Sequence, residues 1–271
     1  MANPNETSVP QERLTTPEFW DSCYQGRDLV AFNERDWRNY VSVQLARLLR
    51  SLELDGKNVC EIGGDAAITA FLARIHPSAS FSIIDFSPLG CALANKLAMK
   101  EGVNLNVYQA DLFSPPRELL CHFDLVFSLG VVEHFTDLSA VLAAKKKLIK
   151  DNGMIFILIP NLDSPIYASL CKRWSKSVFD SHVAHSMNSF LSGHEEAGLS
   201  PIRSGYLGAI GFGMLSMAMA GPEPKSMLDK KLYLWLTRIS KIVHYMEYRT
   251  YDFPTSRLFS PFMYVISKKG R

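Results

Sequence analysis

The sequence predicts a Rossmann-like α/β domain, in which a mostly parallel sheet carries helices on both faces. Three observations lead to this prediction. The stretch from Lys57 to Pro77 has the pattern of a short apolar strand, an acidic residue, a glycine pair and an apolar-periodic helix. A second apolar strand ends in Asp85, and a third, over 103–108, is followed closely by Asp111. Ligands of open α/β sheets bind outside the carboxyl ends of the strands, so these carboxylates mark a candidate site.

The glycine pair after the first strand is the part of this pattern that indicates a ligand site. Val59, Cys60 and Ile62 suit a strand that is buried on both faces. Gly63 and Gly64 then allow a sharp turn and a close approach of the backbone to a ligand, because neither residue carries a Cβ atom. The helix that follows directs its N-terminal amides toward the same ligand.

The remaining elements follow from periodicity and from turn residues. Ser87 and Pro88 are typical of an N-cap and first helical position. Helical spacing predicts helices over 36–52 and 188–197, and a third from Leu138 that the turn at 151–153 closes. Apolar runs predict further strands over 123–128, 154–159, 201–207 and 260–267, which makes seven with the last antiparallel. The lysines at 145–147 are interpreted as an exposed, solvated charge run.

Composition limits the possible functions. With 271 residues, of which 47% are hydrophobic, the chain can bury a sizeable core as one domain with insertions. A formal net charge of +2 offers no basic field for nucleic acid, so no nucleic-acid partner is expected. The five cysteines stand singly and no Cys/His cluster has metal-ligand spacing, which predicts reduced thiols in a cytoplasmic protein. No acidic trio of metal ligands is visible in the sequence, which predicts no metal dependence.

The order of these motifs resembles that of the class I S-adenosylmethionine-dependent methyltransferases. The resemblance is carried by the motifs at 61–64, 85, 110–112, 123–135 and 151–161, and it is greatest to the methyltransferases of quinone biosynthesis and natural-product metabolism. It implies S-adenosylmethionine as cofactor, S-adenosylhomocysteine as product and a small, apolar or aromatic acceptor. The implied cofactor-binding residues are Glu61, Gly63, Gly64, Asp85, Phe86, Asp111, Leu112, Ser128, Leu129 and Gly130.

Within that set the resemblance also implies roles. Glu61 and the glycine backbone would hold the methionine part of the cofactor, and Asp85 its ribose. Asp111 would take the adenine amino group, with Phe86 and Leu112 against the ring. The family usually has glycines where this chain has Asp65 and Ala67. That departure supports an alternative, in which the protein has the fold but acts as an inactive partner or regulatory subunit.

Aromatic and histidine residues are the candidates for binding the methyl acceptor and for removing its proton. His134 and His185 are the candidate bases, since a neutral imidazole can take a proton near neutral pH. For His134 the alternative is that it shapes the loop and binds the cofactor or the backbone. Trp20 and Tyr24 in the leading segment are candidate substrate-binding residues, with burial against the sheet as the alternative. Tyr167 and Trp174, after the fifth strand, are further candidate substrate-binding residues. His182 and His194 are expected on surfaces.

Five segments are expected along the chain. They are a disordered N-terminus (1–16), cap helices (17–54), a core (55–207) with a substrate segment at 161–187, a helical insertion (208–256) and the final strand (257–271). The insertion carries an apolar stripe and several lysines and arginines. Three interpretations stay open: packing on the domain's own core, a lid or homodimer contact, and a surface resting on a membrane, where the enzyme would act on a lipid or quinone.

Overall fold

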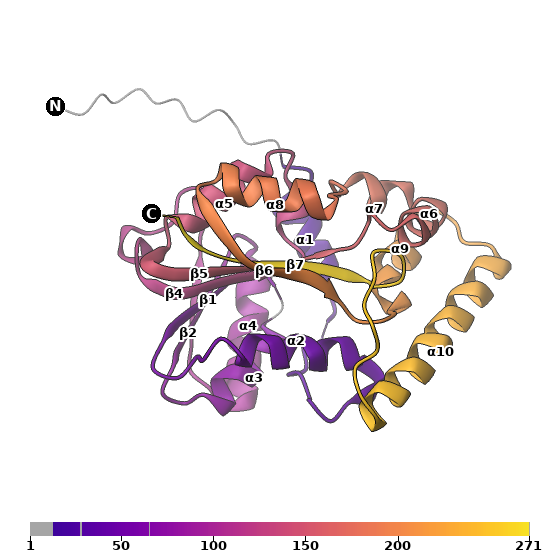
Figure 1. Ribbon diagram of the computed structural model, residues 1–271, viewed down its shortest axis with the longest axis horizontal. Helices are drawn as coiled ribbons and strands as arrows, with labels where there is room; N and C mark the ends of the chain where they lie inside the picture. Colours follow the sequence, from indigo (N-terminus) through magenta and orange to yellow (C-terminus); the bar gives the residue numbers. More distant parts are fainter. Residues whose placement is uncertain (1–12, 28, 65, 271) are drawn as a thin grey trace.

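A seven-stranded sheet forms the centre of the computed structural model, which describes residues 13–27, 29–64 and 66–270 (Figure 1). The strand order is β3-β2-β1-β4-β5-β7-β6, and only β7 runs antiparallel to its neighbours. This confirms the predicted Rossmann-like sheet and its antiparallel last strand. The strands are β1 (Asn58–Ile62), β2 (Ser80–Asp85), β3 (Leu105–Gln109), β4 (Phe123–Leu129), β5 (Ile149–Pro160), β6 (Leu199–Leu207) and β7 (Phe262–Lys269).

Parallel pairing of the first five strands brings their carboxyl ends to one edge. Ile62 is in register with Ile84, and Asp85 with Gln109, so the residues that follow these strands lie side by side. The central strands are almost fully buried because helices cover both of their faces. The sequence motifs after β1, β2, β3 and β4 therefore converge at this edge.

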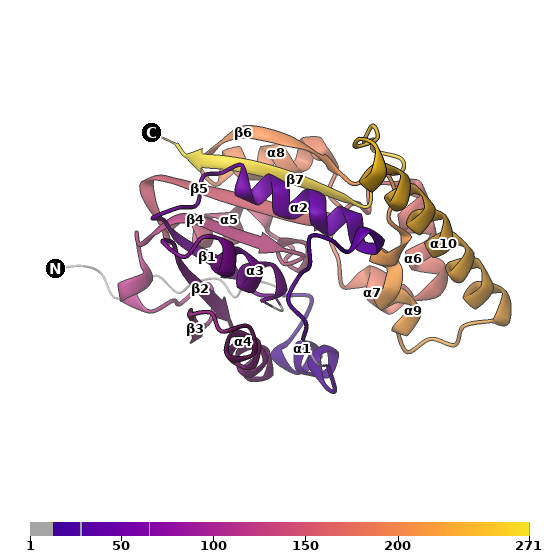
Figure 2. The ribbon, with the colours of Figure 1, turned by 90° about the horizontal axis from the view of Figure 1, so that it is seen from below.

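The helices form two layers around the sheet (Figures 1 and 2). On one face α2, α3 and α4 pack through aliphatic and aromatic side chains, and on the other face α5 and α8 do so. The α-helices are α1 (Pro17–Tyr24), α2 (Tyr40–Arg50), α3 (Ala67–Ile75), α4 (Pro88–Glu101), α5 (Leu138–Lys146), α6 (Pro165–Trp174), α7 (Lys176–Asp180), α8 (Met187–Glu196), α9 (Ser216–Ala220) and α10 (Met227–Arg249). Short 3-10 helices are η1 (Trp37–Asn39), η2 (Arg117–Leu119), η3 (Val132–His134) and η4 (Phe212–Leu215).

Two elements differ from their predicted bounds. The predicted helix over 36–52 is split into η1 and α2, with Asp36 accepting the Arg38 amide at the start. The strand predicted from Met154 begins at Ile149, because Ile149 pairs with Phe123 and a register shift absorbs the turn at 151–153. Helix α5 accordingly ends at Lys146.

Some polar residues expected on the surface are buried. Lys145 is 0% exposed and lies under the sheet, so the lysine run is not a uniformly solvated face. His194 is also 0% exposed and contacts the Ser267 hydroxyl at 2.8 Å. His182 is half-buried between α7 and the 131–135 loop. Helical spacing does not predict the burial of Lys145 and His194, because polar residues of α5 and α8 are buried together with the apolar ones.

The segment from 208 to 256 forms a block at one end of the sheet (Figure 2). Helices α6, α7, α9 and the first half of α10 share an apolar cluster that includes Trp174, Phe212 and Leu236. The second half of α10 is held by polar contacts: the ring nitrogens of His244 lie 3.1 and 2.8 Å from the carbonyl oxygens of Arg38 and Ile210. Within the described residues, no helix has the length and apolar content that a membrane span requires.

Candidate active site

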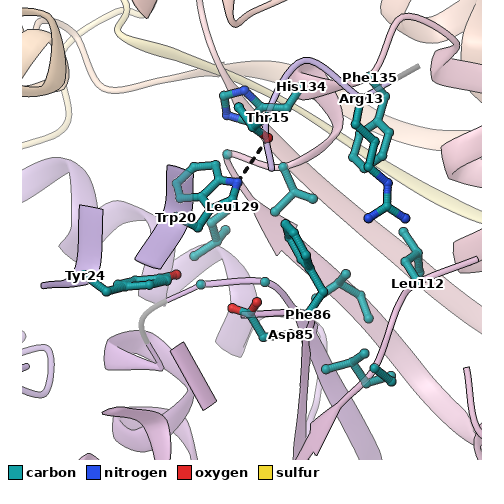
Figure 3. A pocket seen from close by; sticks show the side chains of 17 residues that line it. Arg13, Thr15, Trp20, Tyr24, Asp85, Phe86, Leu112, Leu129, His134 and Phe135 are labelled. Atoms are coloured by element: carbon teal, nitrogen blue, oxygen red, sulfur yellow. Dashed lines mark hydrogen bonds between the residues drawn. The ribbon is translucent and has the colours of Figure 1, made fainter. Parts of the chain in front are cut away.

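A cavity opens where the strand ends converge (Figure 3). Its walls come from the turns after β1, β2, β3 and β4 and from the segment that leads into α1. It is lined by Arg13, Thr15, Trp20, Tyr24, Ile62, Gly63, Gly64, Ile84, Asp85, Phe86, Ala110, Leu112, Leu129, Gly130, Val131, His134 and Phe135.

The glycine turn forms one wall of this cavity. Gly63 and Gly64 have φ angles of 64° and 116°, which side-chain-bearing residues rarely adopt. A Cβ on Gly64 would collide with the carboxylate of Glu61, which lies beneath the turn and accepts a hydrogen bond from Thr69. Glu61 is 2% exposed and does not line the cavity, so it supports the turn from below. Asp65 lies outside the described residues.

Asp85 presents its carboxylate at the end of β2. It is 4% exposed and accepts the backbone amide of Ser87 at 2.8 Å. Burial raises the pKa of Asp85 to about 6, although backbone hydrogen bonds, including that from Ser87, oppose the shift. The group is therefore mostly ionised at neutral pH and can accept hydrogen bonds from a ligand's hydroxyl groups.

The third acidic residue, Asp111, is engaged by an arginine. Arg13 donates to both carboxylate oxygens of Asp111, and the Phe113 amide donates to one of them at 2.8 Å. Phe86 and Leu112 line the cavity beside this pair. Arg13 falls in the segment expected to be disordered, yet it bridges to Phe135 through its backbone, and the polar composition of 1–16 gave no signal of this. Residues 1–12 lie outside the described residues.

The end of β4 supplies the floor. Leu129 and Gly130 line the cavity, and Gly130 has a φ of 73°. Ser128 is 0% exposed and is not among the lining residues. Successive side chains of a strand point to opposite faces, so Ser128 and Leu129 cannot both face the same cavity.

Trp20, Tyr24 and His134 line the same cavity from α1 and from the loop after β4 (Figure 3). The Trp20 indole N–H donates to the Thr15 hydroxyl at 3.1 Å, and the Trp20 ring meets the His134 ring edge-on at 5.2 Å. His134 Nδ1 lies 2.6 Å from the carbonyl oxygen of Ser181, so Nδ1 carries the proton and Nε2 is an acceptor. Burial lowers the pKa of His134 to about 3, and the imidazole is neutral at physiological pH.

The other three sequence candidates lie outside this cavity. His185 is 8% exposed and stacks on Phe190, with ring centroids 6.4 Å apart. Tyr167 and Trp174 are 0% and 1% exposed in the cluster under α6 and α9, and the Tyr167 hydroxyl donates to the carbonyl oxygen of Phe259. Tyr167 and Trp174 have the contacts of packing residues, because the phenol hydroxyl and the indole N–H both have hydrogen-bond partners within the protein.

A carboxylate and two imidazoles meet behind the cavity. Potential ligand atoms of Glu133, His134 and His182 lie within 4.8 Å of one another, and no other described residues form such a group. Both Glu133 oxygens are buried without a hydrogen-bond partner among the described residues. Burial raises the pKa of Glu133, and the nearby Lys145 ammonium partly opposes that shift. Metal independence stays a prediction from the sequence.

A second cavity adjoins the first across the end of β4. Leu129 and Gly130 belong to the walls of both cavities. The other walls are the 30–42 segment, the first turn of α3 and the ends of β5, β6 and β7. Its apolar lining residues are Val30, Ala31, Phe32, Trp37, Val41, Leu45, Ala67, Ile68, Leu158, Leu207 and Phe262, and its polar ones are Asn33, Arg35, Asp36, Arg38, Asn39 and Ser42.

Comparison with known proteins agrees with this geometry. Residues 61–155 match the family model described as a methyltransferase domain. The chain is 26% identical over 167 residues to the ubiquinone biosynthesis O-methyltransferase of Azotobacter vinelandii, covering 62% of this chain and 68% of that protein. It is 28% identical over the same length, with the same coverage, to the enzyme of that name from Pseudomonas fluorescens.

Solved structures share the fold. Geranyl diphosphate C-methyltransferase from Streptomyces coelicolor, in complex with Mg²⁺, geranyl diphosphate and S-adenosylhomocysteine, aligns with a TM-score of 0.55 at 10% identity, over 84% of this chain and 79% of that one. The cyclase SpnF aligns with a TM-score of 0.60 at 12% identity, over 89% and 86% of the two chains. The matched domain, the sequence relatives and the shared fold together support a class I S-adenosylmethionine-dependent methyltransferase.

Proposed function

We propose that the protein transfers the methyl group of S-adenosylmethionine to a small apolar or aromatic acceptor bound in the second cavity. The observation that carries this proposal is the shared wall. Leu129 and Gly130 border both cavities, so a cofactor in one and an acceptor in the other would meet at the end of β4. The sequence relatives, which are named ubiquinone biosynthesis O-methyltransferases, support an apolar ring-bearing acceptor.

The residues of the first cavity fit the cofactor. Gly63 and Gly64 line this cavity with backbone only, and a Cβ would meet Val131 at the first position and Glu61 at the second. Asp85 offers a buried carboxylate for the ribose hydroxyls, and Phe86 an aromatic face for the adenine. Asp65 and Ala67 depart from the family pattern, but Ala67 does not line this cavity.

For methyl transfer, the main task of the protein is to position the acceptor against the cofactor. The bound cofactor supplies an activated methyl group on a sulfonium. The chain must hold an acceptor atom in line with that group and exclude water. Trp20 packs edge-on against His134 in the wall of the first cavity, so these two rings cover that wall. His134 lines the first cavity and not the second, and with its low pKa its Nε2 can accept a hydrogen bond there but is poorly suited to store a proton.

Filling the second cavity tests the proposal. Ser42 is half-buried on α2 and lines this cavity but not the first. We expect Ser42→Phe to reduce methyl transfer to the acceptor at least tenfold, while the affinity for S-adenosylhomocysteine stays unchanged. The measurement is transfer of labelled methyl from S-adenosylmethionine to a panel of apolar phenols and quinols, with calorimetry for the cofactor.

Ser42→Ala is the matched control, because it removes the hydroxyl without filling the space. Unimpaired transfer by Ser42→Phe would contradict the assignment of the second cavity. Failure of the wild-type protein to bind S-adenosylmethionine or S-adenosylhomocysteine would instead favour the alternative of an inactive partner protein with this fold.

One surface favours a membrane as the source of the acceptor. Leu228, Trp235 and Ile242 stand seven residues apart on α10, and these residues are 73%, 59% and 61% exposed. Lys231 and Arg238 form a basic row beside them. An exposed apolar row next to a basic row is typical of helices that lie on anionic lipid surfaces.

The charges on α10 argue against a symmetric dimer through this face. Arg238 is the middle residue of Met227–Arg249, so an antiparallel two-fold contact would place it against its own copy. The acidic residues of the helix do not compensate, because Asp229 bonds to Arg173 and Glu247 is 1% exposed. We therefore propose that this face rests on an anionic membrane, to which an apolar acceptor could partition.

Vesicle sedimentation measures this contact. We expect the protein to sediment with vesicles that contain phosphatidylglycerol and much less with pure phosphatidylcholine. The double variant Trp235→Ser, Ile242→Ser should lose the interaction, because each side chain forfeits roughly 2 kcal/mol of apolar burial. Met99→Ser, which removes an exposed apolar side chain from α4, is the control. Equal sedimentation of the wild type and the double variant, or self-association through α10 in ultracentrifugation, would contradict the proposal.

A further inference from the structure

Residues 13–16 run along the first cavity, which Arg13 and Thr15 line, and form what we call the strap. Arg13 pairs with Phe135 in an antiparallel bridge, and the Leu14 amide donates to the carbonyl oxygen of His134 at 2.9 Å. Thr15 is 7% exposed, and its hydroxyl accepts the hydrogen bond from Trp20. The strap therefore lies on the loop that follows β4 and carries its first side chain into the cavity (Figure 3).

The Arg13 side chain sits in a cage of three aromatic rings and one carboxylate. Its guanidinium carbon lies 5.5 Å from the ring centre of Phe86, 5.3 Å from that of Phe113 and 5.7 Å from that of Phe135. These distances are those of cation–π contacts. Asp111 closes the cage, and both of its oxygens accept from the same arginine nitrogen, Nη2.

A planar guanidinium between aromatic faces, donating to a carboxylate, has the same recognition chemistry as an adenine ring with its amino group. Both are flat, both stack, and both present N–H donors in the plane. We propose that Arg13 occupies the adenine subsite of the cofactor cavity, so that the cofactor binds only after Arg13 has left the cage. This inference rests on the proposed function, since it takes Asp111 and Phe86 as the adenine contacts.

The state of Asp111 supports displacement rather than joint occupancy. Its two oxygens accept two contacts from Arg13 and one from the Phe113 amide, so three of about four acceptor positions of the carboxylate are occupied. The Arg13 and Asp111 side chains are 25% and 39% exposed, so the pair is only partly desolvated. The Arg13–Asp111 pair and its three cation–π contacts therefore lower the apparent affinity for the cofactor. Because the pair is partly exposed, the cofactor can still displace Arg13.

The inference predicts that removal of Arg13 strengthens cofactor binding. We expect Arg13→Ala to bind S-adenosylhomocysteine about tenfold more tightly than the wild type in calorimetry, because the cage is then free. S-ribosylhomocysteine, which has the same sugar and amino acid but no adenine, should bind both proteins equally. This pair of ligands separates competition for the adenine subsite from a general change in the cavity.

Arg27→Ala is the matched control, since it removes an exposed arginine from the same region without touching the cage. Unchanged or weaker binding of S-adenosylhomocysteine by Arg13→Ala would overturn the inference, and weaker binding would mean that Arg13 helps to hold adenine. Binding by the variant but not by the wild type would support both proposals. If neither protein binds the ligand, the proposed function fails and this inference fails with it.

Discussion

Asp85→Ala is expected to weaken binding of S-adenosylhomocysteine roughly hundredfold or more. Asp85 is the buried carboxylate that faces the proposed ribose position at the end of β2. Each hydrogen bond to a charged group contributes about 1.5–3 kcal/mol, and two ribose hydroxyls can donate to the carboxylate. Loss of about 3 kcal/mol corresponds to a hundredfold change in affinity. Calorimetric titration of the wild type and the variant measures it directly.

Asp124→Ala is the control for the loss of an acidic side chain. Asp124 also accepts a backbone amide, that of Asn58 at 2.8 Å, and pairs with Lys150, but it lies at the opposite end of β4. Its removal should lower stability modestly and leave the affinity for S-adenosylhomocysteine unchanged. If Asp124→Ala weakened binding as much as Asp85→Ala does, Asp85 would have no special role at the cavity.

The pKa of Asp85 adds a dependence on pH. Because burial raises this pKa to about 6, the carboxylate gains a proton as the pH falls through 6 and no longer accepts two hydrogen bonds. Wild-type affinity should therefore be constant above pH 7 and fall about tenfold by pH 5, where about one molecule in ten remains ionised. In Asp85→Asn this pH dependence should disappear.

The parts of the site that the sequence predicted are those encoded by local patterns. Gly63, Gly64 and Asp85 directly follow apolar strands, and parallel pairing of consecutive strands brings such positions to one edge. The predicted N-cap Ser87 accepts the Gly90 amide for the same local reason. Strand and helix periodicity thus predicts both the sheet and the motifs at its carboxyl edge.

The features of the fold and the site that could not be predicted from the sequence depend on contacts between residues that are far apart in the chain. Arg13 reaches Asp111 across 98 positions of sequence, and a polar segment gives no sign of such a partner. Lys145 is buried because α5 meets the sheet beside Glu133, which a helical wheel does not show. Tyr167 and Trp174 follow β5 as a substrate segment would, yet α9 and α10 cover them. Tertiary contacts, rather than propensity, decide these positions.

Gly64→Ala is expected to lose both stability and cofactor binding. At a φ of 116°, a residue with a side chain is strained by about 1–3 kcal/mol. The added methyl group would also collide with the Glu61 carboxylate, which is buried and held by Thr69. The turn must therefore move, and the backbone amides that face the cavity move with it. We expect a loss of about 3 kcal/mol in the free energy of unfolding and no measurable binding of S-adenosylhomocysteine.

Gly56→Ala separates the two causes. Gly56 has a φ of 71°, but no atom lies within 4 Å of a Cβ built on it, and it is far from the cavity. This variant should bear only the backbone strain, about 1 kcal/mol in urea unfolding, and should bind the ligand normally. Wild-type affinity in Gly64→Ala would mean that the turn after β1 does not approach the cofactor. A loss of stability equal to that of Gly56→Ala would instead mean that Glu61 yields to the methyl group, because the collision is then relieved at little cost.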